Sequence, residues 1–228
     1  MPKAGGTSSR NIVRSWFEPN FHTHYINEMD GSLPAPVDLA QVHCPSQPAV
    51  IFGHFNRRRG AGIPDYYPEV RQFVTILRDP LALAISRYFY TRKNGKDWKQ
   101  SPETLDLTIN DYLRECRIDM LQHFPTDTSI DNYEEVIHEH FVHIGITEKL
   151  SCSMAVIARK LGKRPPRYVP VKNRCSREGT ICEQAQKAFR ERHELEFAVY
   201  DCAKRLHLAE ASTLRCSLIQ RLLGRSMR

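Results

Sequence analysis

The chain has 228 residues, of which 41% are hydrophobic and 26% are charged, a composition that supports one globular domain and argues against intrinsic disorder. Lys and Arg number 33 against 26 Asp and Glu, and the net charge of +7 favours an anionic ligand, whether nucleotide, anionic glycan or nucleic acid. The seven cysteines form no CxxC pair, so a zinc ribbon is disfavoured and reduced thiols are the simpler interpretation. With no evident signal peptide and no bilayer-spanning apolar run, the sequence predicts a soluble, cytoplasmic, single domain over residues 1–228.

A glycine- and hydroxyl-rich loop over residues 2–9 comes first and leads into a helix ending near Phe17. Small residues let backbone N–H groups approach an oxyanion closely, and the start of a helix adds its positive end. A flexible N-terminus is the alternative interpretation. The Walker A pattern is absent, which disfavours a nucleotide kinase. The candidate anion-binding residues are Lys3, Ala4, Gly5, Gly6, Thr7 and Ser8.

Further along the chain, strands alternate with helices, a pattern that predicts an α/β fold with a mainly parallel sheet covered on both faces. The strand over residues 72–77 is apolar and β-branched, as expected for a central strand buried on both faces. A basic, flexible loop is expected over residues 56–62. The remaining predicted elements are a surface connection over 27–48, strands over 49–52 and 141–146, and helices over 80–92, 105–116, 132–139, 148–161 and 181–206.

Two segments that follow predicted strands carry candidate site residues. His54 lies at the end of the strand over 49–52, and histidine is the natural general base near neutral pH; a hydrogen-bonded buried histidine is the alternative. Arg78 lies at the end of the next strand, where open α/β sheets bind ligands. Ser86 is two helical turns beyond Asp79, so Arg78 and Ser86 can converge on one phosphate. Taken singly, a salt bridge would explain Arg78 and helix packing would explain Ser86.

These segments together resemble the carbohydrate sulfotransferases that use 3′-phosphoadenosine 5′-phosphosulfate (PAPS), the group that includes heparan sulfate 2-O-sulfotransferases and many bacterial relatives. Five stretches resemble the family's motifs and follow one another in the family's order. The loop at Pro2-Lys3 resembles the 5′-phosphosulfate loop, Gly53-His54 resembles the catalytic Gly-His, and Arg78-Asp79-Pro80 with Ser86 resembles the 3′-phosphate-binding segment. Gly145-Ile146-Thr147-Glu148 resembles the family's strand–turn–helix, and residues 190–200 resemble its closing helix.

The resemblance implies a P-loop-NTPase-like central parallel sheet flanked by helices, with PAPS as co-substrate and no metal. It implies Lys3 and His54 as catalytic residues, a carbohydrate or other hydroxylated acceptor, no nucleic acid partner, and a Golgi membrane location if an N-terminal anchor has been truncated. Two departures stand out. The strand that normally precedes the loop is missing, so we expect the loop to be mobile until ligand binds. Phe52 replaces a second histidine, which argues against the heparan sulfate 2-O-sulfotransferase acceptor.

Several basic and histidine-rich stretches have weaker functional readings. The resemblance implies that residues 172–180 help to close over the nucleotide, with Lys172, Arg174 and Ser176 as candidates, although a basic run is often only a solvated face. Residues 57–59 are three arginines that could receive an anionic acceptor or remain surface charge. The histidines of residues 138–143 do not fit H-E-x-x-H, so no metal site is predicted. The alternative function is a nucleotide- or polyanion-binding protein that has lost catalysis.

Overall fold

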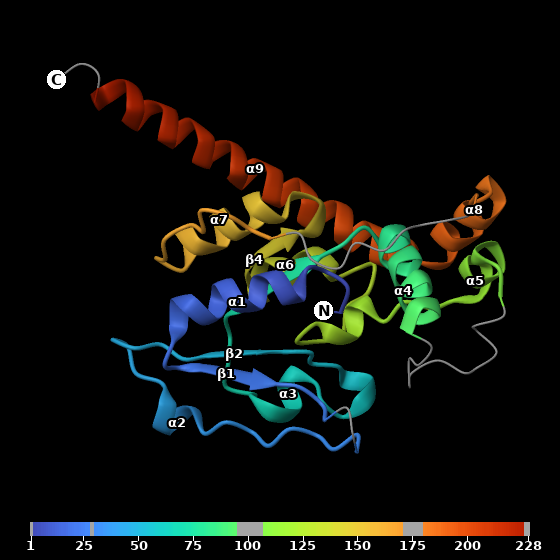
Figure 1. Cartoon of the computed structure of the whole chain (residues 1–228), viewed down its shortest axis with the longest axis horizontal. Coiled ribbons are helices and arrows are strands. Elements are labelled where there is room, and N and C mark those ends of the chain that lie inside the picture. The colour runs from blue at the N-terminus through green and yellow to red at the C-terminus, as the bar shows by residue number, and fades with distance from the viewer. Residues whose placement is uncertain (1, 28–29, 95–106, 171–179, 226–228) are drawn as a thin grey trace.

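A computed structural model describes residues 2–27, 30–94, 107–170 and 180–225 (Figure 1). The helices that it contains are α1 (Gly6–Phe17), α2 (Leu39–Val42), α3 (Ile63–Tyr66), α4 (Pro80–Asn94), α5 (Ile109–Glu115), α6 (Tyr133–His140), α7 (Leu150–Lys160), α8 (Glu183–Arg192) and α9 (Glu194–Arg225). No helix in these ranges is long and apolar enough to cross a bilayer.

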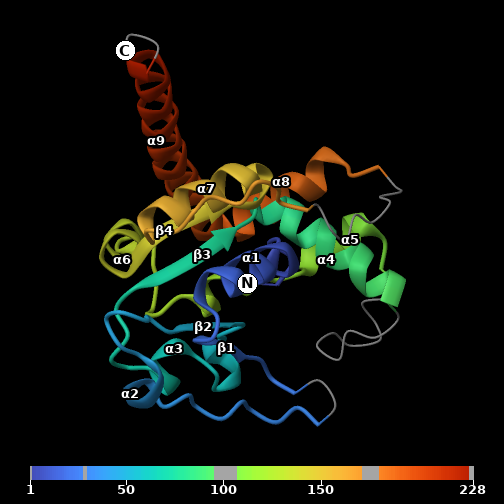
Figure 2. The same cartoon turned by 60° about the vertical axis from the view of Figure 1, so that its left-hand side comes forward.

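The strands form two parallel pairs, so the fold is mixed α/β with small parallel sheets flanked by helices (Figure 2). Strand β1 (Phe21–His24) pairs with β2 (Val50–Gly53), and β3 (Phe73–Leu77) pairs with β4 (Phe141–Ile146). The predicted parallel direction is confirmed, but the single sheet is not observed, because β2 and β3 do not pair with each other in the described part of the chain. Side chains of α1 and α7 pack against residues of both pairs instead.

Strand β3 also corrects a prediction about burial. Leu77 is fully buried, but Val74, the second residue of the strand, is 39% exposed. The strand has a hydrogen-bonded neighbour only on its β4 side within the described residues, so it is not enclosed as a central strand would be.

Three clusters of buried side chains join these elements into one body. The first packs α9 and α6 against β3 and β4, and its centre includes the fully buried Leu77 and Val199. The second joins α4, α5 and α8 around Leu113 and Phe189. The third joins α1 and α7 to both strand pairs around Met154. Side chains from elements all along the chain therefore contribute to these buried clusters.

The predicted helix over 181–206 is two helices, α8 and α9, that meet at His193. This histidine leaves helical geometry with φ −118° and ψ 34°, and it is buried. Its Nε2 accepts a hydrogen bond from the N–H of Ile118 at 3.2 Å, while Nδ1 lies 3.0 Å from the carbonyl oxygen of Phe189. A tertiary contact thus ends the helix where the apolar periodicity alone predicts continuity.

Two other segments differ from the prediction. Residues 21–24 form β1, although no strand was expected there. Arg57–Arg59 form a 3₁₀ turn closed by a backbone bridge between Asn56 and Ala61, so the predicted flexible loop has regular structure. Asn56 is buried and its side-chain amide donates to Asp119 at 3.1 Å, which fixes the turn against the body of the protein.

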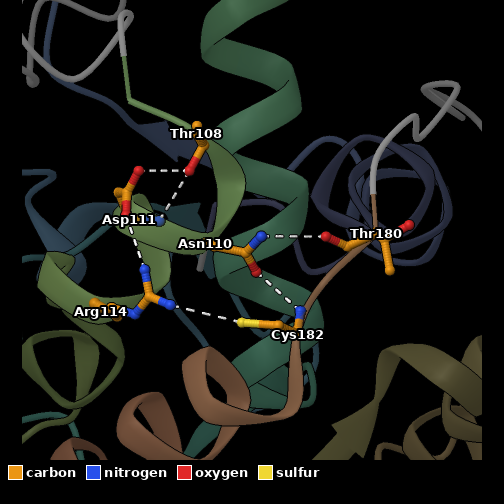
Figure 3. A network of polar contacts seen from close by, with 6 residues as sticks. All are labelled: Thr108, Asn110, Asp111, Arg114, Thr180 and Cys182. Carbon is orange, nitrogen blue, oxygen red and sulfur yellow. Dashed lines mark hydrogen bonds and ion pairs between the residues drawn. The ribbon is translucent and has the colours of Figure 1, made fainter.

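Helix α5 holds the segment that leads into α8 through a network of polar contacts (Figure 3). The Asn110 side chain donates to the carbonyl oxygen of Thr180 at 3.2 Å and accepts from the N–H of Cys182 at 2.9 Å. Arg114, one turn along α5, lies 3.6 Å from the sulfur of Cys182 and pairs with Asp111 at 2.8 Å. The start of α8 is thereby fixed on α5.

A polar network is buried between β4, α7 and α9. Nε2 of His143 lies 3.1 Å from Nδ1 of His207, and its Nδ1 lies 3.0 Å from Glu210, which in turn pairs with Lys160 at 2.7 Å. Burial, and then the charges of His207 and Lys160, lower the pKa of His143 to about 3. Burial also lowers the pKa of His207. Both rings are therefore neutral in the folded protein at neutral pH.

We predict that the free energy of unfolding falls as the pH drops below 6.5, the ordinary histidine pKa, because the unfolded chain then binds protons that buried His143 rejects. The loss attributable to one such histidine reaches about 1.4 kcal/mol per pH unit. Urea unfolding at intervals from about pH 7 to about pH 4 measures this slope. His143→Gln should flatten it, whereas His138→Gln, at an exposed position, should not. An unchanged slope in His143→Gln would contradict the assignment.

Candidate functional site

The loop at the N-terminal end of α1 enters the helix through two residues with positive φ. Lys3 has φ 62° and Gly5 has φ 79°, both in the left-handed region, and α1 begins at the next residue, Gly6. The first-turn N–H groups of a helix have no acceptor within the helix and carry its positive end. No acidic residue occupies this first turn. The predicted loop-to-helix transition is therefore present. The N–H groups of Ser8 and Ser9 donate to the carbonyl oxygen of Gly5, so the N–H groups of Gly6 and Thr7 form the positive end of α1.

Gly5 suits this loop in conformation and in packing. A Cβ atom on Gly5 would lie 3.1 Å from Cδ2 of Leu150, in addition to the cost of its positive φ. A Cβ on Gly6 would lie 3.9 Å from Cε1 of His54. The ring of His54, which is distant in sequence, therefore lies against the start of α1.

Arg78 brings the second predicted segment to the same place. It follows the last residue of β3, and its Nη1 donates a hydrogen bond to the carbonyl oxygen of Lys3 at 3.1 Å. The guanidinium thus contacts the loop directly, so Lys3, Gly6, His54 and Arg78 lie in one region.

Helix α4 contributes a residue that the sequence analysis did not select. The Lys3 ammonium nitrogen lies 3.6 Å from the centre of the Tyr90 ring, a cation–π contact. Ser86 is half-buried and lies one turn before Tyr90 on the same face of α4. The spacing of four residues from Ser86 was the signal that could have identified Tyr90.

The remaining loop residues differ in how open they are. Ala4 and Ser8 are buried, with 2% and 3% exposure, whereas Thr7 is exposed. The hydroxyl of Ser8 donates to the carbonyl oxygen of Pro170 at 2.5 Å. Its proton is therefore used within the protein in this conformation, and Thr7 has the more accessible hydroxyl of the two. The candidates Lys172, Arg174 and Ser176 lie outside the described residues.

His54 is held at the carboxyl end of β2 by the neighbouring strand. Its N–H donates to the carbonyl oxygen of His24 at 3.1 Å, and a Cβ on Gly53 would lie 1.8 Å from that same oxygen. Only glycine fits before His54 without displacing β1. The half-buried His54 ring also meets the Tyr25 ring edge-on, with centroids 5.0 Å apart.

The two C-terminal motifs of the resemblance meet beside Arg78. Thr147 donates to the carbonyl oxygen of Leu77 at 2.9 Å. The Glu148 carboxylate accepts from the N–H of Asp79 at 3.2 Å and from the hydroxyl of Tyr200 at 3.1 Å. Burial, and then the charge of Glu148, raises the pKa of Tyr200, so its hydroxyl keeps its proton. The end of β3 is thereby tied to α9.

Tyr200→Phe is expected to lower the free energy of unfolding by about 1 to 3 kcal/mol, because it removes a hydrogen bond to a charged group from a buried side chain. Tyr133→Phe is the matched control, since the Tyr133 hydroxyl contacts Glu134 at an exposed position, and it should change stability by less than about 0.5 kcal/mol. Urea unfolding of both variants measures the difference. Equal effects would show that the bond to Glu148 does not anchor α9.

The other predicted polar stretches take no part in this convergence. Arg57 pairs with Asp127, and Arg58 and Arg59 belong to the same 3₁₀ turn. His143 belongs to the buried network with His207 described above. Across the described ranges, no group of three or more histidine, cysteine or acidic side chains is arranged to hold a metal ion.

Comparison with known proteins identifies no relative of the chain. No protein-family model, curated protein or solved structure gives a significant match to the chain.

Proposed function

We propose that the chain is a PAPS-dependent sulfotransferase that transfers the sulfuryl group to a hydroxyl of an acceptor, with carbohydrate as the acceptor class. The observation that carries the proposal is the hydrogen bond from Arg78 to the carbonyl oxygen of Lys3, with the His54 ring packed against the same loop. A general anion-binding turn would not require either residue. Their convergence supplies both a nucleotide site and a base.

Each residue has a distinct role in the proposed reaction. The sulfur–oxygen bond to the nucleotide phosphate breaks while a new bond forms to the acceptor oxygen, and negative charge develops on the leaving phosphate oxygen. Lys3 and the first-turn N–H groups of α1 stabilise that charge. Arg78 and Ser86 bind the 3′-phosphate of the nucleotide. His54 takes the proton of the acceptor hydroxyl.

A P-loop-like fold is part of the proposal. It is supported by the turn from Lys3 into α1 and by the two parallel strand pairs that pack on α1.

Incubation of the protein with sulfur-labelled PAPS and a panel of hydroxylated acceptors tests the function. We expect label in at least one carbohydrate, at a rate that EDTA does not change. Binding of adenosine 3′,5′-bisphosphate without transfer to any acceptor would instead support a nucleotide-binding protein without catalysis. Failure of both binding and transfer would overturn the proposal.

A further inference from the structure

A basic pocket with a volume of about 360 Å³ is lined by residues outside the candidate site. Its wall is formed by the 3₁₀ turn Arg57–Arg59, by the stretch 117–128 and by the junction of α8 and α9. Among the described residues, none from the loop over residues 2–9 lines it. The pocket is therefore separate from the site proposed for the nucleotide.

Two arginines of the pocket are anchored at neighbouring points of the backbone. Arg117 precedes Ile118 and Arg192 precedes His193, and the hydrogen bond from Ile118 to the His193 ring joins the two segments at 3.2 Å. Both arginines line the pocket together with His193, and burial of that ring lowers its pKa. The protein thus holds two positive charges near each other.

Two carboxylates on the pocket wall already have cationic partners. Asp127 pairs with Arg57. Asp119 lies 3.4 Å from Arg87. Burial raises the pKa of Asp119, but the charges of Arg87 and His123 outweigh it and lower the pKa, so this carboxylate is ionised and engaged. Each of these two acids therefore already neutralises one cation.

The other arginines of the pocket are Arg58, Arg117 and Arg192, and they differ from Arg57 in their ion pairs. Within 2–27, 30–94, 107–170 and 180–225, the ion pairs closer than 4.0 Å include none of Arg58, Arg117 and Arg192. The third acid of the lining, Glu196, forms no such pair with them either. Three cations therefore face one pocket with a single acid that is not already paired, and like charges held together favour an anionic ligand.

We propose that Arg58, Arg117 and Arg192 bind an oxyanion group, a sulfate, phosphate or carboxylate, in this pocket. Guanidinium groups suit such ligands because their N–H donors match two oxygens at once. A free inorganic anion and an acidic group on an acceptor share this chemistry. The position favours the acceptor, because Arg58 is four residues beyond His54 in a turn fixed by Asn56. That assignment to an acceptor rests on the proposed function.

Titration of the ¹⁵N-labelled protein with sodium sulfate at constant ionic strength tests the site. Saturable shifts of the Ile118 and His193 amide signals are expected. Combined Arg117→Gln and Arg192→Gln substitutions should weaken sulfate binding at least about tenfold. Arg167→Gln, at an exposed position elsewhere, removes one charge and should leave it unchanged. The absence of saturable shifts, or equal affinity in the double variant, would overturn the proposal.

A second measurement distinguishes the two sources of the anion. An oligogalacturonate should bind more tightly than an uncharged galactose oligomer of equal length, and the double variant should lose the difference. Equal binding of the two oligomers beside intact sulfate binding would assign the pocket to a free inorganic anion. Affinity for adenosine 3′,5′-bisphosphate should be the same in wild type and double variant. If the wild-type protein binds sulfate but does not bind adenosine 3′,5′-bisphosphate, only the proposed function is overturned.

Discussion

Replacement of His54 by alanine is expected to slow sulfuryl transfer by about 10²- to 10⁴-fold, the usual effect of removing a general base. The ring lies against Gly6 at the start of α1, and its backbone is fixed by the carbonyl oxygen of His24. Transfer should therefore depend on the imidazole itself. Initial rates with labelled PAPS measure the loss.

The control for this experiment separates catalysis from folding. Nucleotide affinity should be nearly unchanged in His54→Ala, because the proposed nucleotide contacts come from the loop and Arg78. His138→Ala, at an exposed position on α6, should turn over normally. Loss of folding in His54→Ala would show a structural histidine, and normal turnover would require a different base.

Arg78→Ala should weaken binding of adenosine 3′,5′-bisphosphate by about 1.5 to 3 kcal/mol, the range for hydrogen bonds to charged groups. This corresponds to about 10- to 150-fold in affinity. Two causes act together in this variant. The 3′-phosphate loses its cation, and the carbonyl oxygen of Lys3 loses the donor that holds the loop.

Two further variants show whether the weaker nucleotide binding of Arg78→Ala comes from the lost guanidinium group. Arg78→Lys keeps the positive charge but not the fork of donors, so it should recover only part of the affinity. Arg71→Ala, which removes an exposed arginine before the opposite end of β3, should bind as wild type does. Undiminished affinity in a folded Arg78→Ala protein would show that Arg78 is structural.

The elements governed by local signals were predictable from the sequence. Asp79 caps α4, with its side chain accepting from the N–H of Ala82 at 2.8 Å, and Pro80 is the first helical residue, as expected. Strand β4 occupies the predicted residues, Phe141–Ile146. Capping and apolar patterning act within a few residues, which is why such elements can be read from a single sequence.

Features that depend on distant contacts were not predictable. The end of α8 is set by the bond between His193 and Ile118, which are 75 residues apart in sequence. The contacts of Lys3 are also distant: its carbonyl oxygen accepts from Arg78 and its side chain lies over the Tyr90 ring, while the mobility of the loop before ligand binds stays a prediction. Among the described strands, the pairing of β2 with β1 and not with β3 likewise depends on the tertiary arrangement, not on either strand's own pattern.

Calorimetric titration with adenosine 3′,5′-bisphosphate and with AMP tests the central claim most directly, because the two nucleotides differ in the 3′-phosphate assigned to Arg78 and Ser86. The proposed site predicts at least about tenfold tighter binding of the bisphosphate, and it predicts that Arg78→Ala removes the difference. Equal affinity of the wild-type protein for the two nucleotides would contradict the assignment of the site.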